Sequence, residues 1–268
     1  MTWINPEIWL KALPLNSRRY FLTIAYLGTN YHGWQVQKIG QTSVQGMIEE
    51  SLLTIFNEKI SVTGQGRTDA GVDAEGQTAH ISVPDKLPPE RLVRAVNSLL
   101  PFDIRILKID SVHPDAHSRR DALSKTYRYQ IWTERVLPPF NYYTWHILPY
   151  EIDTEVLSAC CEMARGVHDF SAFTVRPHLY ASCVREIIDA GVAFCRGGLV
   201  LSFTGNGFLR YMVRRLAGAM VEAARGKKDV KWFRDLLYGH GSFSGGPTLP
   251  AKGLILEEVR YPSSCYNI

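Results

Sequence analysis

Segments with the pattern of β-strands alternate with segments of helical periodicity, and this order occurs twice along the chain. The first round opens with residues 20–27, a short stretch rich in β-branched and aromatic side chains in which both alternating sets are mostly apolar. This pattern predicts a strand buried on both faces. A helix is predicted next, because Thr42 and Gln45 match a capping box and the apolar residues that follow recur at helical spacing.

The remaining elements are predicted from the same two periodicities. In the first round these are strands at 60–63 and 78–83, a helix over 89–100 and a strand at 104–109. The second round has strands at 126–132, 187–195, 199–203 and 253–261 and helices over 154–164, 208–224 and 230–238. This order favours an α+β fold of two related halves with mainly antiparallel strands over a parallel Rossmann sheet. We expect an N-terminal extension over 1–17, a first half over 18–113 and a second half over 114–268.

The composition is that of an ordinary globular protein. Hydrophobic residues make up 46% of the chain and charged residues 21%, which excludes a disordered or collagen-like chain. The net charge of +4 permits a polyanionic partner, and arginine pairs near aromatic residues at 18–19, 119–120 and 214–215 are typical of nucleic-acid-binding surfaces. The first residues lack a basic n-region, and no apolar run approaches the roughly 20 residues that span a bilayer. We therefore expect a cytoplasmic protein without a membrane segment.

The sequence contains no motif for a metal or a cofactor. Its five cysteines include no C-x-x-C pair, which favours a reduced chain without a structural zinc site. His113 and His117 have the spacing of two ligands on one helical turn, but Pro114 disfavours a helix there. A P-loop, a G-x-G-x-x-G after a strand and a G-x-S-x-G elbow are all missing, so ATP, nicotinamide and serine-hydrolase chemistry have no support. We expect neither metal nor cofactor.

Polar residues and glycines are concentrated in the loop GQGRTDAGVDA, between two predicted strands. Its glycines let a large ligand approach the backbone, and reactive groups tend to lie on such loops of a rigid scaffold. The carboxylate of Asp69 could attack an anomeric carbon or an electron-poor ring if it is ionised, oriented and shielded from water. A tight turn in which Asp69 hydrogen-bonds its own backbone accounts equally well for the composition.

An ionised Asp69 in a pocket needs a cationic partner, and the segment GNGFLRYMVRRLAGAM offers one. Its apolar residues cover most of a helical wheel and leave a narrow polar stripe that contains Arg214. A buried guanidinium must pair with a carboxylate or a phosphate to offset its desolvation. The sequence leaves open whether the partner of Arg214 is Asp69 or an exposed acid nearby.

Three residues alternate along the predicted strand at 126–132 and just before it. Lys125, Tyr127 and Tyr129 are spaced by two and therefore share one face. A tyrosine that faces a cleft can stack on a base, and its phenol can move a proton. A half-buried aromatic on a sheet face is the alternative, and it is the commoner fate of tyrosine in strands.

The chain resembles the TruA family of tRNA pseudouridine synthases. The resemblance is carried, in this order, by YLGTNYHGWQVQ, TSVQG, GQGRTDAGVDAEGQTAH, HSRRDALSKTYRYQI, GNGFLRYMVRRLAG and TLPAKGLILEEVRY. GRTDAG in its loop context is the most specific of these motifs. The resemblance implies a mixed, mainly antiparallel sheet of two related ferredoxin-like halves flanked by helices, a homodimer that grips tRNA, and a reaction that needs neither metal nor cofactor.

The resemblance also implies an activity and its residues. The activity is the isomerisation of uridine to pseudouridine in the anticodon stem-loop of tRNA, at tRNA positions 38–40. Asp69 corresponds to the family's nucleophile, Tyr127 to the tyrosine that stacks on the target base, and Arg214 to the arginine that pairs with the aspartate. Six basic residues are expected to contact RNA: Arg67, Arg119, Arg120, Lys125, Arg210 and Arg215.

Three positions depart from the family pattern. Asp73 stands where the family usually has histidine, and its carboxylate, if close to Asp69, would disfavour ionisation there or repel a nearby phosphate. Ser242 aligns with a common arginine, and Ala116 replaces an aromatic residue. These departures bear on the grip on the substrate and on the choice of target uridine.

Other functions fit some of the same residues. A protein of this fold could bind and remodel tRNA without modifying it, and then the basic surface matters while Asp69 does not. A synthase acting on a different RNA is a second alternative. A small-molecule acid/base enzyme such as a glycosidase would need a second carboxylate, which Asp73 or Glu75 could nominally supply.

Overall fold

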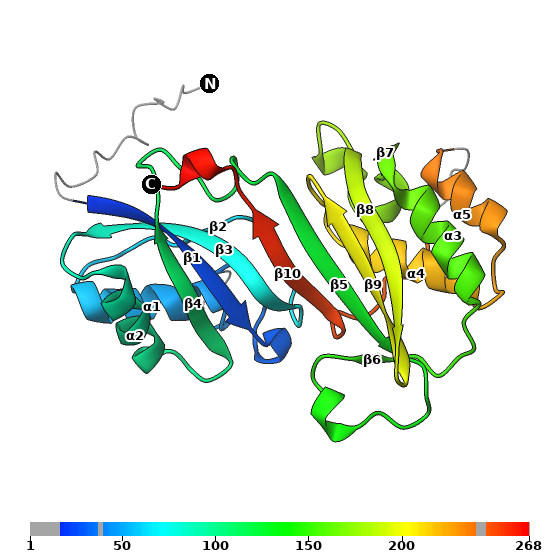
Figure 1. The fold of residues 1–268 in the computed structure, drawn as a ribbon, viewed down its shortest axis with the longest axis horizontal. Helices are drawn as coiled ribbons and strands as arrows, with labels where there is room; N and C mark the ends of the chain where they lie inside the picture. The colour runs from blue at the N-terminus through cyan, green and yellow to red at the C-terminus, as the bar shows by residue number, and fades with distance from the viewer. Residues whose placement is uncertain (1–16, 37–39, 240–244, 268) are drawn as a thin grey trace.

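One large sheet forms the centre of the molecule. The structure is a computed structural model that describes residues 17–36, 40–239 and 245–267. Its strands run in the order β4 (Ile104–Ser111), β1 (Ser17–Tyr26), β3 (Asp73–Pro84), β10 (Leu254–Arg260), β5 (Ser124–Trp132), β9 (Gly198–Gly205), β8 (Val184–Cys195) and β7 (Gly166–Asp169) (Figure 1). Two further short strands pair with β3 and β5, respectively: β2 (Thr63–Gly64) and β6 (His146–Ile147).

β10 lies in the middle of the sheet, between a strand from the first part of the chain and a strand from the second part. β10 runs antiparallel to β5 and parallel to β3, where Ile255 is opposite Asp73. Among the described strands, the only other parallel pair is β5 with β6, so the sheet is mixed and mainly antiparallel, as predicted. β10 therefore brings the loop before β3 close to β5.

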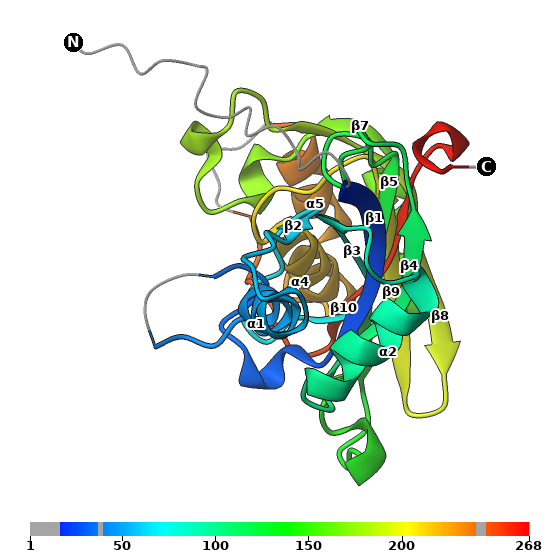
Figure 2. The ribbon, with the colours of Figure 1, turned by 90° about the vertical axis from the view of Figure 1, so that its left-hand side faces the viewer.

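Five α-helices of the described residues flank the sheet. α1 (Val44–Phe56) and α2 (Pro89–Leu99) lie at the end formed by the first part of the chain, and α3 (Thr154–Ala164), α4 (Met212–Ala224) and α5 (Val230–Leu237) lie at the other end. α1 and α4 lie behind the sheet in Figure 1 and to the left of its strands in Figure 2. Each end of the sheet has its own apolar core, and Tyr127 packs against both of them.

The structure differs from the sequence predictions mainly at the ends of elements. The helix expected from residue 208 begins at Met212, because Tyr211 before it has a left-handed backbone with φ of 63°. The cap of α1 is Ser43 and not Thr42, since Ser43 Oγ accepts a hydrogen bond of 3.2 Å from the Gly46 N–H. The strand expected from 78 begins at Asp73, and of the strand expected at 60–63 only Thr63 lies in a strand, β2. β6 and β7 were not predicted.

Two of the sequence predictions fall on residues whose structure is not described. The proposed extension over 1–17 lies almost entirely outside the described residues, and so does Ser242. In the ranges that the structure describes, no helix combines the length and the hydropathy of a membrane span. All five cysteines are free thiols.

Candidate active site

The loop that carries Asp69 connects β2 to β3, and its backbone is held by the segment that follows β1. The Trp34 N–H donates to the Thr68 carbonyl at 3.2 Å, and the Tyr26 and Thr68 hydroxyls share a hydrogen bond of 2.8 Å. Within the loop, the Val72 N–H donates to the Asp69 carbonyl at 3.1 Å. Asp69 therefore projects from a turn that is fixed on both sides.

Asp69 forms an ion pair with Arg214, which is 145 residues away in the sequence. Arg214 Nη1 lies 3.1 Å from Asp69 Oδ2, and the two side chains are only 14% and 25% exposed, respectively. Arg214 Nε donates to the Leu249 carbonyl at 2.7 Å, which fixes the guanidinium plane. The carboxylate that the sequence left unidentified is thus Asp69.

Two opposing effects set the protonation of Asp69. Burial raises the pKa of the Asp69 carboxyl, whereas the positive charges of Arg214 and Arg210 lower it. Both guanidiniums also lie against the ring of Tyr211, with Cζ at 5.0 Å from the ring centroid for Arg214 and 4.9 Å for Arg210. The Arg214 partner thus offsets part of the desolvation that favours the neutral acid.

Tyr127 lies on β5 close to this pair. Its ring packs edge to face against Phe208, with centroids 5.1 Å apart. Burial and the negative charge of Asp69 both raise the pKa of the Tyr127 phenol, so the group is neutral at ordinary pH. Tyr129, two residues on, is fully buried and donates from its hydroxyl to the Pro250 and Lys252 carbonyls at 2.7 and 3.2 Å. Tyr129 therefore supports the segment that also holds Arg214.

Lys125 lies on the same face of β5 as Tyr127, and two further cations act on it. Burial lowers the pKa of Lys125, and the positive charges of Arg119 and Arg185 lower it further. Arg185, at the start of β8, was missed in the sequence because a single arginine near a strand end carries no distinctive pattern. In the described ranges, none of these three cations forms an ion pair with a carboxylate.

The other expected RNA contacts are in different surroundings. Arg67, Arg120 and Arg210 are exposed, and Arg210 donates to the Tyr211 hydroxyl at 3.2 Å. Arg215 instead points into the protein, where Nη2 donates to the Gly245 carbonyl at 2.9 Å and to the Ala172 carbonyl at 3.3 Å. These hydrogen bonds give Arg215 a structural role, and they do not support its predicted contact with RNA.

The structure also locates the two carboxylates considered as second acids. Asp73 is buried and accepts a hydrogen bond of 2.7 Å from the Gly28 N–H. The charges that shift the pKa of Asp69 are those of Arg214 and Arg210, and the charge of Asp73 is not among them. Glu75 pairs with Arg128. The expected electrostatic effect of Asp73 on Asp69 is therefore not seen. Ala116, another departure, is buried in a small apolar cluster.

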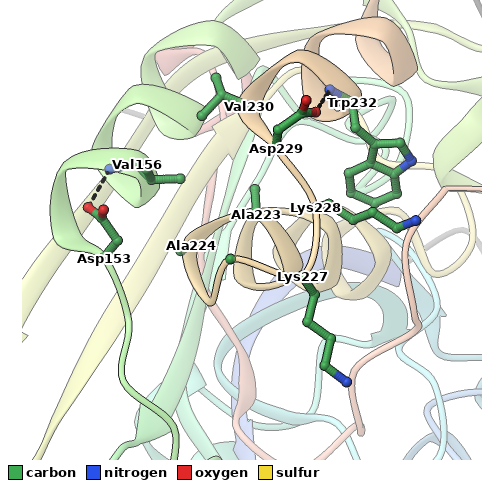
Figure 3. Close-up of a pocket in the computed structure, with 10 residues that line it drawn as sticks. Asp153, Val156, Ala223, Ala224, Lys227, Lys228, Asp229, Val230 and Trp232 are labelled. Carbon is green, nitrogen blue, oxygen red and sulfur yellow. Dashed lines mark hydrogen bonds between the residues drawn. The ribbon is translucent and has the colours of Figure 1, made fainter.

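The site has no metal-binding cluster near it, and a separate hollow lies elsewhere on the molecule, in the part of the chain that the structure describes. Among the residues that the structure describes, no three His, Cys, Asp or Glu side chains are grouped to hold a metal ion. A hollow lined by Lys227, Lys228 and Trp232 lies between α3 and the loop from α4 to α5 (Figure 3). It lies at the C-terminal end of α4, whereas Arg214 lies at the N-terminal end, so the hollow is separate from the Asp69 site.

Comparison with known proteins decides the family. The family model described as tRNA pseudouridine synthase matches residues 22–119 and 161–262. The chain belongs to this family. It is 37% identical to tRNA pseudouridine synthase A 1 of Protochlamydia amoebophila over 247 residues, which cover 90% of this chain and 96% of the relative.

Two more relatives carry the same description. The chain is 39% identical to tRNA pseudouridine synthase A of Solidesulfovibrio magneticus, with 91% of each chain covered. It is also 39% identical to tRNA pseudouridine synthase A 1 of Desulfotalea psychrophila, with 91% of this chain and all of the relative covered. The protein is therefore a TruA-type tRNA pseudouridine synthase and an isomerase, and the fold and family expected from the sequence motifs are confirmed.

Proposed function

We propose that this synthase isomerises uridine in the anticodon stem-loop of tRNA, at tRNA positions 38–40, and that Asp69 is its nucleophile. The observation that carries the proposal is the partly buried ion pair of Asp69 with Arg214. A carboxylate in such a site needs a cation to stay ionised, and an ionised, oriented carboxylate is what nucleophilic catalysis requires.

The reaction needs no external group donor. The bond between N1 of the base and C1′ of the ribose breaks, the base rotates, and C5 bonds to C1′. C5 then loses its proton and N1 gains one, so atoms and charge balance. The Asp69 carboxylate would act by attack at C1′ or at C6, or as a base at C2′, and all three routes use its ionised form.

Tyr127 is proposed to hold the target base. The uridine must leave its stack to reach Asp69, at a cost of a few kcal/mol that contacts in the site must return. Tyr127 offers a ring beside Asp69, and aromatic rings stack on any base. Because its phenol is neutral, Tyr127 fits stacking and hydrogen bonding better than proton abstraction at ordinary pH.

The cations around the site are proposed to bind RNA phosphates. Lys125 shares a face of β5 with Tyr127, and it is proposed to bind phosphate together with Arg119 and Arg185, whose charges act on it. Three exposed arginines are added to this group: Arg67, Arg120 and Arg210. Two residues along a strand span about 6.6 Å, so Lys125 and Tyr127 are spaced to hold a phosphate and a base of one nucleotide. Binding should weaken as salt rises.

Two further expectations rest on the resemblance to the family. A homodimer that grips tRNA across both subunits and a cytoplasmic location are proposed on that basis. Analytical ultracentrifugation tests the dimer. One chain has a mass of 30.3 kDa, and a single species of twice that mass is expected. A single species of 30.3 kDa would contradict the dimer.

The activity is tested by tritium release from a tRNA transcript labelled at uridine C5, without added metal or nucleotide. Wild type should release tritium, whereas Asp69→Asn should bind the transcript within a few-fold of wild type and release none. Transcripts with cytidine at positions 38–40 should release none with wild type. A folded wild type that binds tRNA but releases nothing would favour the non-catalytic tRNA binder, and release from the cytidine transcripts would favour another target.

A further inference from the structure

Asp73, four residues after Asp69, is a buried carboxylate that the proposed reaction does not use. Its side chain lies at the start of β3, and the residue is only 3% exposed. Oδ1 accepts a hydrogen bond of 2.7 Å from the Gly28 N–H. Oδ2 is buried and has no hydrogen-bond partner among the protein atoms that the structure describes. Burial raises the pKa of Asp73 to about 6.

The hydrogen bond to Gly28 ties two segments that lie backbone against backbone. A Cβ atom at Gly28 would lie 2.2 Å from the Val72 carbonyl oxygen, and one at Gly33 would lie 2.7 Å from the Thr68 carbonyl oxygen. Gly33 also has φ of 91°, which favours glycine. The segment 28–34 is therefore pressed along the backbone of residues 68–72, with Asp69 in the middle of the contact.

Three hydrogen bonds fix this contact along its length. The Trp34 N–H donates to the Thr68 carbonyl, and the Tyr26 hydroxyl bonds the Thr68 hydroxyl. At the other end of the loop, the Gly28 N–H donates to Asp73. Asp73 provides the anchor after Asp69, and Thr68 provides the anchor before it.

Fold stability alone does not account for a carboxylate at this position. An ionised carboxylate with one oxygen unpaired in the interior costs free energy of folding. An asparagine of the same shape would accept the same hydrogen bond from Gly28 without that charge. What the carboxylate adds is a charge-assisted hydrogen bond, which is roughly twice as strong as one between neutral groups.

We propose that Asp73 is a positioning residue for Asp69, and that its ionised carboxylate holds segment 28–34 against the catalytic loop through the Gly28 N–H. This inference rests on the proposed role of Asp69. Around the Asp73 carboxyl, the described groups that interact with it are the Gly28 N–H from the turn after β1 and the phenol of Tyr26 from β1, which burial keeps neutral. β10 contributes the backbone of Ile255 opposite Asp73.

The test compares kcat and KM for tritium release in wild type, Asp73→Asn and Asp73→Ala between pH 5 and 8.5. Asp85→Asn is the matched control, because Asp85 directly follows the far end of β3 and lies on the surface. The dissociation constant for tRNA and the folded fraction are measured for each variant. Asp69→Asn is assayed in parallel.

The expected result is a loss in kcat without a change in KM. At pH 8, Asp73→Asn should lower kcat about three- to tenfold, and Asp73→Ala about ten- to a hundredfold, since small displacements of a reacting group are costly. The ratio of wild-type to Asp73→Asn kcat should fall toward one as the pH drops through about 6. This ratio cancels the titration of Asp69, which both proteins share.

Two outcomes would overturn the proposal. One is a wild-type kcat in both Asp73 variants, with Asp69→Asn inactive. The other is a ratio that does not change with pH, which would make Asp73 merely structural. If Asp73→Ala does not fold, the pH dependence of the Asp73→Asn ratio alone decides. Activity in Asp69→Asn would instead show that the proposed nucleophile is wrong.

Discussion

Replacing Asp73 by asparagine should stabilise the fold, and more so at high pH. The folded-state pKa of Asp73 is raised from 3.8 to about 6, so the folded state binds this proton more tightly than the unfolded chain. The contribution of Asp73 to stability is therefore complete below pH 3.8 and is lost as the pH rises through about 6. Each pKa unit corresponds to about 1.4 kcal/mol, so ionised Asp73 lowers the free energy of unfolding by about 3 kcal/mol at pH 8.

The pH dependence separates this effect from other consequences of the substitution. At pH 5 the loss of unfolding free energy caused by Asp73 is about half of its value at pH 8, because the carboxyl in the folded state is then mostly protonated. The altered shape of the side chain acts at both pH values, whereas the hydrogen bond from Gly28 to the ionised form is already contained in the pKa of about 6. The difference in unfolding free energy between Asp73→Asn and wild type should therefore grow by about 1.4 kcal/mol from pH 5 to pH 8.

Thermal unfolding at the two pH values measures this change. For a chain of this size, about 1.4 kcal/mol corresponds to about 2.5 °C in Tm, so the variant should gain that much on wild type between pH 5 and pH 8. Asp85→Asn controls for the loss of an exposed carboxylate. A Tm difference that is constant with pH, or that shrinks toward pH 8, would refute the assignment of a raised pKa to Asp73.

Three further predictions concern the site itself. Arg214→Met should raise the pKa of Asp69 and lower kcat roughly a hundredfold or more. A pH–rate profile checks this, and an acid limb at the same pH as in wild type would count against the ion pair. Tyr127→Phe should retain most tRNA affinity and Tyr127→Ala should lose it along with kcat; equal losses in both, measured by steady-state kinetics, would argue for the hydroxyl over stacking. Lys125→Met and Arg185→Met should each weaken tRNA binding. In salt titrations, each should also reduce by about one the slope of the log binding constant against log salt concentration. Unchanged slopes would show that these cations do not contact RNA phosphates.

Much of the fold could be predicted from periodicity. The helices α2, α3 and α5 begin at the predicted residues, because their starts carry local signals such as Pro89 and the Asp153 cap. The start of α4 could not be predicted, since a left-handed backbone is uncommon at a residue other than glycine and nothing in the sequence around Tyr211 indicates it. The position of β10 between β3 and β5 also depends on pairing across the whole chain.

The candidate site shows the same division between local and distant information. The glycine-rich loop identified Asp69, and the polar stripe identified Arg214, but only the folded chain brings them to 3.1 Å. Arg214 and Arg215 are adjacent in the sequence, yet a helix turns by about 100° per residue and directs them to different partners. The role of Asp73 could not be predicted either, because its partner Gly28 lies 45 residues earlier.

The most direct test of the central claim is nucleoside analysis of a purified tRNA transcript after a single turnover with excess enzyme. Wild type and Asp69→Asn are compared at concentrations that saturate the transcript with each protein. The account predicts pseudouridine in place of uridine with wild type and none with Asp69→Asn. Equal pseudouridine with both proteins, or none with a wild type that has bound the transcript, would contradict it.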